Sequence, residues 1–491
     1  MPQRPLLSSM FASPGYSPHA RPSMSHPGLV YHNGCLVSGS LDALIHLLIP
    51  SADYYPDRAY IFTFLLTSRL FLEPQDVLAQ LVHVCLQRQH KGMDVGTRTS
   101  SWRILQLLAE WTDTFPYDFL NEETMSRLKE VITQATIGRD DVLRRTGAQL
   151  LQRLLRRLAT QQQYEETLGS QATAGKTRGP LSPRPGACAR DLFATCGDAG
   201  LVAQQLTFIE LERLSQIGPE ELVGAFSPKG SIEQHQQAHV GVKSTKNLEA
   251  YVEWFNHLIF LVATEVCLPL KKKQRAKVIE FFIEVARMCF SMGNFNSFMA
   301  IISGLSMIPV SRLKKTWTKV KTAKFDILEN YMDPSSNFCN YRTALRGAAQ
   351  RCRNGRSTHE KIVIPFFSLF VKDIYFLNEV CSSRLANGHV NFEKFWDLAR
   401  QVGEFVSWKD VECPFPRDRR IISYLLSTQV LSEDGMFIIC LVTASETWLL
   451  AHNWRGLGQT ICWSTIYAYR RVHDLCMVTM FVSGRNPERP M

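Results

Sequence analysis

Apolar side chains return every three or four residues through most of the first third of the chain, as they do on one face of a helix. Acidic and Asn residues at 121–123 and 140–141 stand where helices prefer to begin. The pattern predicts an all-helical domain over residues 35–159. Its clearest segments are 41–48, 60–72, 77–85, 102–115, 121–137 and 140–158.

A second helical pattern runs over residues 191–434, where long amphipathic segments occur at 248–268 and 277–292. Alternation of the strand type is scarce, so we expect an all-α fold with two helical domains. Residues 160–190 are rich in Gly, Pro, Gln and Ser and predict a linker. Residues 1–34 hold six prolines and predict a disordered tail. Beyond Gly435 the periodicity is lost, so 435–491 predicts a poorly ordered tail.

The chain of 491 residues carries a net charge of +10, which raises three classes of partner: nucleic acid, an anionic membrane and an acidic protein. Six of these ten charges lie in the segments 1–34, 160–190 and 436–491. A nucleic-acid-binding module concentrates its charge in its folded part, and this chain does not, so the distribution argues against that class.

Two basic runs remain inside the second helical domain, Lys271–Arg275 and Arg312–Lys324. A solvated helix start or loop explains such runs, and so does contact with an acidic surface. The sequence leaves both interpretations open.

The sequence lacks the common motifs of catalytic sites. It has no phosphate-binding P-loop, no zinc-protease motif, no nucleophile elbow of the α/β-hydrolases and no protein-kinase motifs. His235 and His239 are four residues apart but lack neighbouring ligands, so no metal and no cofactor are expected. The thirteen cysteines have no zinc or disulfide spacing. With no signal peptide and no apolar stretch long enough to span a membrane, we expect a cytoplasmic protein with reduced thiols.

Several longer strings, taken together and in order, resemble the Cdc25-homology catalytic domain of Ras-family guanine-nucleotide exchange factors. Segments 39–44 and 62–71 resemble the Ras exchanger motif that precedes this domain. The compact layout resembles the small RasGEF domain-containing family, member-one type, except for an atypical C-terminal tail. The strings that carry the catalytic-domain resemblance are 204–212, 217–222, 282–289, 293–297, 300–305, 310–317, 337–342 and 364–374.

The resemblance implies a GTPase regulator that makes and breaks no covalent bond. Such a protein binds the nucleotide-free GTPase more tightly than the loaded form, and linkage then weakens nucleotide binding equally. The implied partner is a Ras-superfamily GTPase, with the Rap subfamily favoured and Ras allowed. We expect a monomer that makes at most weak membrane-surface contact, with recruitment to membranes left open. A helical adaptor that binds GTPases without exchange is the alternative.

The resemblance also implies a helical hairpin that enters the switch I and magnesium site of the GTPase. Here the hairpin would comprise a helix over 366–383, a turn at 385–388 and a return helix from Asn391. Tyr375 and Glu379 match the residues that intrude on magnesium and contact the phosphate loop; their spacing of four puts them on one helical face. In place of Tyr375, several relatives have an aliphatic residue, which blocks magnesium by its bulk. The Tyr375 hydroxyl could instead form a hydrogen bond with the GTPase.

Supporting roles follow from the same resemblance. Asn337, Tyr341 and Arg342 match a stretch that faces switch II, although a helix cap with a core tyrosine explains them equally simply. Lys372 is assigned to GTPase binding on the hairpin. The remaining residues are expected to support the hairpin: Pro365 at the first helical position, Phe366, Phe367 and Phe392 in packing, and Asn391 as the N-cap of the return helix.

Overall fold

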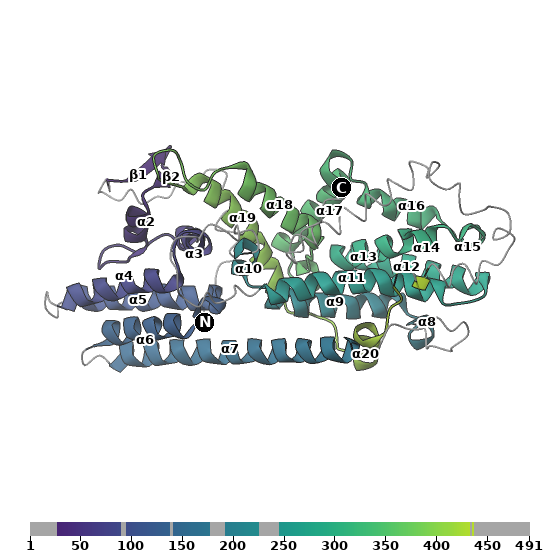
Figure 1. Cartoon of the computed structure of the whole chain (residues 1–491), viewed down its shortest axis with the longest axis horizontal. Helices are drawn as coiled ribbons and strands as arrows, with labels where there is room; N and C mark the ends of the chain where they lie inside the picture. The colour runs from purple at the N-terminus through teal and green to yellow at the C-terminus, as the bar shows by residue number, and fades with distance from the viewer. Residues whose placement is uncertain are drawn as a thin grey trace, which may run out of the picture. The chain divides into compact units, whose positions relative to one another are not determined.

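The computed structural model describes residues 27–89, 95–137, 141–176, 192–224, 245–432 and 435–436. Most of them are helical, which confirms the all-α class (Figure 1). The chain divides into two compact units. The first comprises Met1–Glu166, Gln216–Asn247 and Lys372–Ser407; the second comprises Thr167–Ser215, Leu248–Val371 and Trp408–Met491.

The first unit contains the helices predicted between residues 35 and 159. Side-chain caps begin several of them: the Asp57 carboxylate accepts from the Ala59 N–H at 2.8 Å, and the Asn121 side chain accepts from the Glu123 N–H. Figure 1 shows α4, α5 and α6 packed side by side. The elements are β1 Leu29–His32, β2 Cys35–Gly39, α2 Leu41–Leu48, α3 Arg58–Thr67, α4 Pro74–Gln89, α5 Val95–Thr114, α6 Glu122–Thr136, α7 Asp141–Lys176 and α10 Pro219–Gly224.

A small antiparallel sheet in this unit was not predicted. Strands β1 and β2 form a hairpin across Asn33–Gly34, whose φ values of +50° and +80° suit a two-residue turn. The third strand, β3 Val390–Asn391, pairs with β2. The residues from Leu29 onward therefore lie in a sheet instead of the disordered tail, because strands this short carry too little alternation to be recognised in sequence.

Helix α7 also departs from the prediction, since it runs to Lys176 through the first half of the predicted linker. Gln and Glu make up most of residues 160–167, and these residue types tolerate a helix well. The remainder of the linker, 177–190, lies outside the described residues, as do residues 437–491 of the predicted tail.

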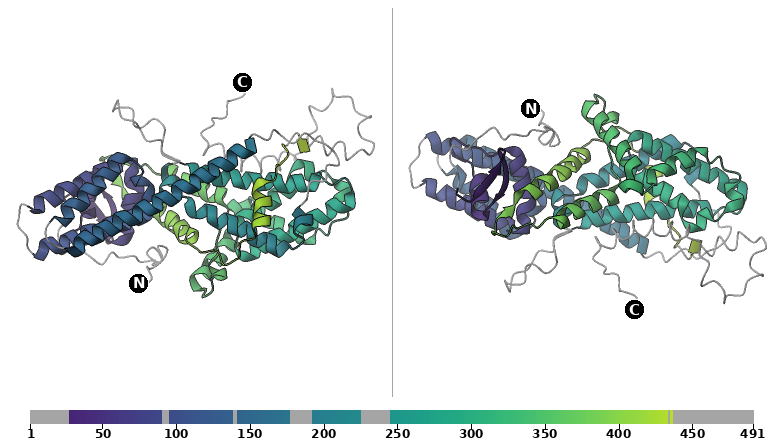
Figure 2. Two further views of the ribbon diagram at one scale, coloured as in Figure 1. Left: turned by 90° about the horizontal axis from the view of Figure 1, so that it is seen from below. Right: turned by 90° about the horizontal axis from the view of Figure 1, so that it is seen from above.

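The second unit is built around α11, α12 and α13, whose apolar faces form one core (Figure 2). Every side chain of α13 from Phe295 to Leu305 is buried. A Cβ on Gly304 would lie 2.7 Å from the Ile259 carbonyl oxygen, so glycine allows the close approach of α13 to α11. The helices are α8 Leu192–Thr195, α9 Ala199–Gln216, α11 Lys246–Cys267, α12 Lys272–Met292, α13 Phe295–Ser306, α14 Ile308–Ser311, α15 Lys314–Trp317, α16 Ala323–Glu329, α17 Ser335–Asn354 and α20 Arg419–Ser427.

Two further helices form the predicted hairpin, α18 Phe367–Val380 and α19 Phe392–Lys409 (Figure 1). The division between the two units falls within α18, after Val371, and again near the end of α19, after Ser407.

Candidate functional site

The hairpin turn forms where the sequence places it. The Leu385 N–H donates to the His389 carbonyl at 2.9 Å, and the Gly388 N–H donates to the Leu385 carbonyl at 2.9 Å. Gly388 has φ of +81° with open space around it, so glycine is favoured here for its backbone conformation alone. A short tight turn of this kind holds the ends of α18 and α19 together.

The beginning of α18 is held by two side chains from the second unit. The Phe366 N–H donates to the Tyr341 hydroxyl at 2.8 Å, and the Phe367 N–H donates to the Asn296 amide oxygen at 3.1 Å. These bonds satisfy N–H groups that a helix start leaves without helical partners. Pro365 precedes the first helical residue by two positions, so the predicted placement at the first helical position is wrong. The Phe366 N–H must stay outside the helix to reach Tyr341.

Asn296 is in turn fixed by a buried carboxylate, Glu210 on α9. The Glu210 side chain accepts from the Asn296 amide at 3.1 Å, the Ser297 hydroxyl at 2.7 Å and the Trp254 indole at 3.2 Å. Burial raises the pKa of Glu210 above its usual value, although these donors oppose the shift. The network connects α9, α11 and α13 to the first residue of α18.

The return helix begins as predicted. The Asn391 side chain accepts from the Lys394 backbone N–H at 3.3 Å and donates to the Ser382 carbonyl at 3.1 Å, so Asn391 is the N-cap of α19. The side chain of Phe392, which is expected to pack in support of the hairpin, is buried. Phe366 and Phe367 are likewise buried, and Phe366 belongs to the core of the second unit.

The first unit braces the hairpin through aromatic contacts. The rings of Tyr60 and Phe392 stack with their centroids 5.3 Å apart, and Phe71 meets Phe395 edge-on at 5.8 Å. The Trp396 indole N–H donates to the Leu36 carbonyl on β2 at 3.0 Å. Within the first unit, α19 is therefore joined to the segment between Leu36 and Phe71.

The outward face of α18 carries the predicted working residues. Glu379 is exposed and Tyr375 is half-buried, one helical turn apart. Lys372 is half-buried, with its ammonium 5.6 Å from the centroid of the Phe376 ring. Two large apolar side chains that the sequence analysis did not single out, Phe376 and Val380, are 51% and 77% exposed beside Glu379. Their spacing of four residues, which puts them on one face of a helix, is the sequence signal that could have identified them.

Asn337, Tyr341 and Arg342 lie on α17 and belong to the second unit, whereas Lys372, Tyr375 and Glu379 belong to the first. Asn337 is exposed, and Ser336, Asn337 and Phe338 form a left-handed turn with φ between +51° and +60°. The Arg342 guanidinium donates to the Asn337 carbonyl at 2.7 Å and supports this turn.

Tyr341 does not fit the predicted GTPase contact, because only 2% of it is exposed and its hydroxyl is bonded to Phe366. Its burial agrees with the alternative given in the sequence analysis, in which Tyr341 is a core residue. Tyr341 therefore supports the start of α18.

In the ranges that the structure describes, no group of three or more His, Cys, Asp and Glu side chains is placed to hold a metal ion. His235 and His239 lie outside those ranges. Nor does any helix there have the length and apolarity needed to cross a membrane. The arrangement at α18 is that of a binding surface: a carboxylate and apolar groups on a helix held at both ends.

Comparison with known proteins agrees with this arrangement. Residues 36–131 match the RasGEF N-terminal motif, and residues 201–396 match the RasGEF domain. The chain is 56% identical over 445 residues to Ras-GEF domain-containing family member 1B of Mus musculus, covering 89% of this chain and 94% of that relative. It is 53% identical over 441 residues to member 1C of Homo sapiens, covering 88% and 93%.

The two matched regions and the braced hairpin define a Ras-family guanine-nucleotide exchange factor. Such a protein regulates a GTPase by promoting nucleotide release, and it makes and breaks no covalent bond. At this level of identity and coverage, the chain belongs to the Ras-GEF domain-containing family.

Proposed function

We propose that this chain promotes GDP release from a Rap-subfamily GTPase by inserting the α18–α19 hairpin at the switch I and magnesium site. The observation that carries the proposal is the exposed Glu379 carboxylate, one turn from Tyr375 on a helix anchored at its start by Tyr341 and Asn296. A rigid helix displaces a switch region better than a mobile one, because less of the binding free energy is lost in ordering it.

We assign each of these residues a separate role in exchange. Glu379 competes for the groups that hold the phosphates, and Tyr375 occupies the space next to magnesium or donates its hydroxyl to the GTPase. Phe376 and Val380 add apolar contact, while Asn337 and Arg342 engage the region of switch II. The choice of the Rap subfamily rests on the family resemblance of the sequence.

We further propose that the protein acts as a cytoplasmic monomer that is recruited to membranes. The described cysteines form no disulfide with one another, which suits a reducing compartment. Recruitment brings such a protein to the surface where lipid-anchored GTPases would be found.

The test is release of a fluorescent GDP analogue from purified Rap, Ras, Ral and Rho proteins. The full chain should accelerate release from Rap most strongly, and Glu379→Ala should reduce that acceleration by about 10- to 100-fold. Glu379→Gln separates the charge of the side chain from its size. Glu123→Ala removes an exposed carboxylate from α6 and serves as the matched control.

Acceleration that Glu379→Ala leaves unchanged would rule out the assigned role of this carboxylate. If the chain binds GTPases but accelerates release from none, the adaptor function replaces the exchange function. A version ending at Asp434 determines whether residues beyond this point change either result.

A further inference from the structure

The two basic runs of the second unit, forty residues apart in sequence, lie side by side in the structure. The buried Arg275 on α12 joins them: its Nε donates to the Thr316 hydroxyl on α15 at 3.2 Å, and its Nη1 donates to the Pro269 carbonyl at 3.2 Å. The first turn of α12 therefore packs against α15 (Figure 1). The Arg275 guanidinium is therefore committed to a contact inside the unit.

Exposed lysines lie on the two segments that this contact joins, and we name them the basic face: Lys271, Lys273, Lys314 and Lys319. Neither residues 268–279 nor residues 285–325 contain an Asp or Glu, so neither of the two segments contributes a carboxylate to this surface. Like charges kept together on a folded surface lower the free energy of unfolding, so such a cluster points to an anionic partner.

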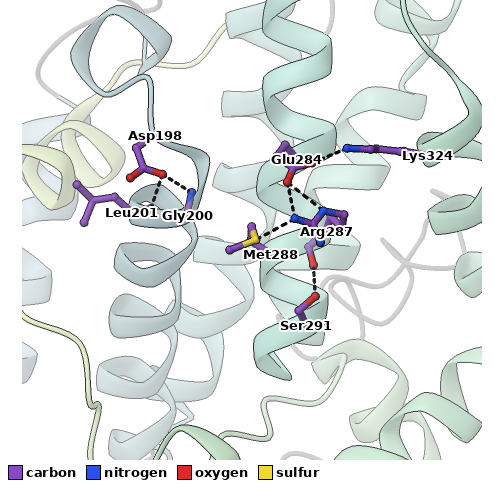
Figure 3. A network of polar contacts seen from close by, with 8 residues as sticks. All are labelled: Asp198, Gly200, Leu201, Glu284, Arg287, Met288, Ser291 and Lys324. Atoms are coloured by element: carbon purple, nitrogen blue, oxygen red, sulfur yellow. Dashed lines mark hydrogen bonds and ion pairs between the residues drawn. The ribbon is translucent and has the colours of Figure 1, made fainter.

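The basic face ends where carboxylates from α12 begin. Glu280 accepts the backbone N–H of Lys321 at 3.2 Å. Glu284 pairs with Arg287 and with Lys324 at 3.2 Å, as Figure 3 shows. The positive charge of Lys324 is therefore compensated locally. Residues 268–279, at the beginning of α12, contain no Asp or Glu.

The apolar groups around the basic face distinguish among anionic partners. Leu270 precedes Lys271 in the loop between α11 and α12 and is 52% exposed. The aromatic residues of this region face inward: the Trp317 indole N–H donates to the Val310 carbonyl at 3.0 Å, and the Trp317 and Phe325 rings pack 5.1 Å apart. Single-stranded nucleic acid needs exposed rings on which bases stack. An aliphatic side chain among lysines suits the boundary between lipid headgroups and acyl chains.

We propose that the basic face binds the headgroups of an anionic lipid bilayer and that Leu270 enters the headgroup boundary. The lysine stems extend toward the bilayer, with their ammonium groups at the phosphates. This surface lies on α12 and α15 and uses no residue assigned to the hairpin, so vesicle binding and nucleotide exchange are separable.

The test is sedimentation of the full chain with vesicles of phosphatidylcholine, with and without about 30% phosphatidylserine, since each basic residue near such a surface contributes appreciably to binding. The triple variant Lys273→Gln, Lys314→Gln, Lys319→Gln should weaken binding to the anionic vesicles by about 10- to 100-fold. Leu270→Ser should weaken it by about threefold to tenfold. Binding should also weaken as salt is raised, because salt screens these charges.

The matched control is Lys129→Gln, Arg145→Gln, Arg156→Gln, which removes the same charge from exposed positions of α6 and α7 in the first unit. It should bind anionic vesicles nearly as well as the original chain. Thermal unfolding of both triple variants establishes that each remains folded. Exchange on a GTPase without a lipid anchor, measured in solution, should be equal in both.

Three results would overturn the proposal: equal loss of vesicle binding in the two triple variants, equal binding to vesicles with and without phosphatidylserine, or no loss in the first triple variant. Loss of binding to a single-stranded oligonucleotide with vesicle binding intact would assign the basic face to nucleic acid instead.

Discussion

The ammonium group of Lys394 on α19 donates to the Cys381 carbonyl oxygen at 2.8 Å, immediately beyond the last residue of α18. It also donates to the Asn378 carbonyl at 2.6 Å and to the Ser383 hydroxyl at 2.9 Å. Lys394 is only 7% exposed, and burial lowers the pKa of its ammonium group. One side chain thus binds carbonyls on both sides of Glu379 that a helix end leaves without partners.

Replacing Lys394 with Met should lower the free energy of unfolding by about 1 to 3 kcal/mol, because the Asn378 and Cys381 carbonyls lose a charged donor. The same change should slow GDP release, since Glu379 lies between Asn378 and Cys381. Urea unfolding and nucleotide release measure the two effects. Lys129→Met, an exposed substitution in the same unit, should change neither. Full activity of Lys394→Met would mean that the end of α18 needs no such clamp.

The buried Glu210 carboxylate predicts a pH dependence of stability. Because burial raises its pKa, the folded protein holds this proton at pH values where the unfolded chain has lost it. The contribution of Glu210 to stability is therefore greatest at low pH and decreases as pH rises through the raised pKa.

Glu210→Gln removes this titration, so the stability difference between the original chain and the variant should shrink or reverse as pH rises. Urea unfolding at several values between about pH 4 and pH 7 provides the measurement, since the unfolded carboxyl titrates near the lower limit. Glu123→Gln on the surface is the control. Parallel stability curves for the original chain and Glu210→Gln would contradict the assignment.

Phe376 should contribute to partner binding and little to stability, because half of its side chain is exposed. Phe376→Ala should reduce the rate of GDP release by about tenfold, as expected for an aromatic contact at an interface. It should alter the free energy of unfolding by less than about 1 kcal/mol. Leu155→Ala on α7, 52% exposed in the original chain, is the control for loss of an exposed apolar group. A large loss of stability would place Phe376 among the packing residues instead.

Tyr60 tests how far the Ras exchanger segment supports the hairpin. Its ring stacks on Phe392, and its hydroxyl donates to the Leu44 carbonyl at 2.6 Å. Tyr60→Phe should lower the free energy of unfolding by about 1 kcal/mol, through loss of the hydrogen bond. Tyr60→Ala should lower it by about 3 to 5 kcal/mol, because a cavity replaces the ring. If both variants unfold alike, the stacking contributes little.

Features that depend on neighbours in the chain could be predicted from the sequence. Helical periodicity predicts most of the helices, and the sequence likewise predicts the cap at Asn391 and the turn at 385–388. The spacing of Tyr375 and Glu379 placed them on one face. Each of these follows from hydrogen bonds and side-chain contacts within a few residues, which are encoded locally.

Long-range partners required the folded chain. Nothing near Asn296 indicates that its amide caps α18, and nothing near Tyr341 indicates that its hydroxyl is buried against Phe366. The pairing of β2 with β3 joins residues more than three hundred positions apart. Arg275 likewise joins two basic runs that appear separate in the sequence. Such contacts depend on how the helices pack, because the same polar side chain in another packing would be solvated and without a structural role.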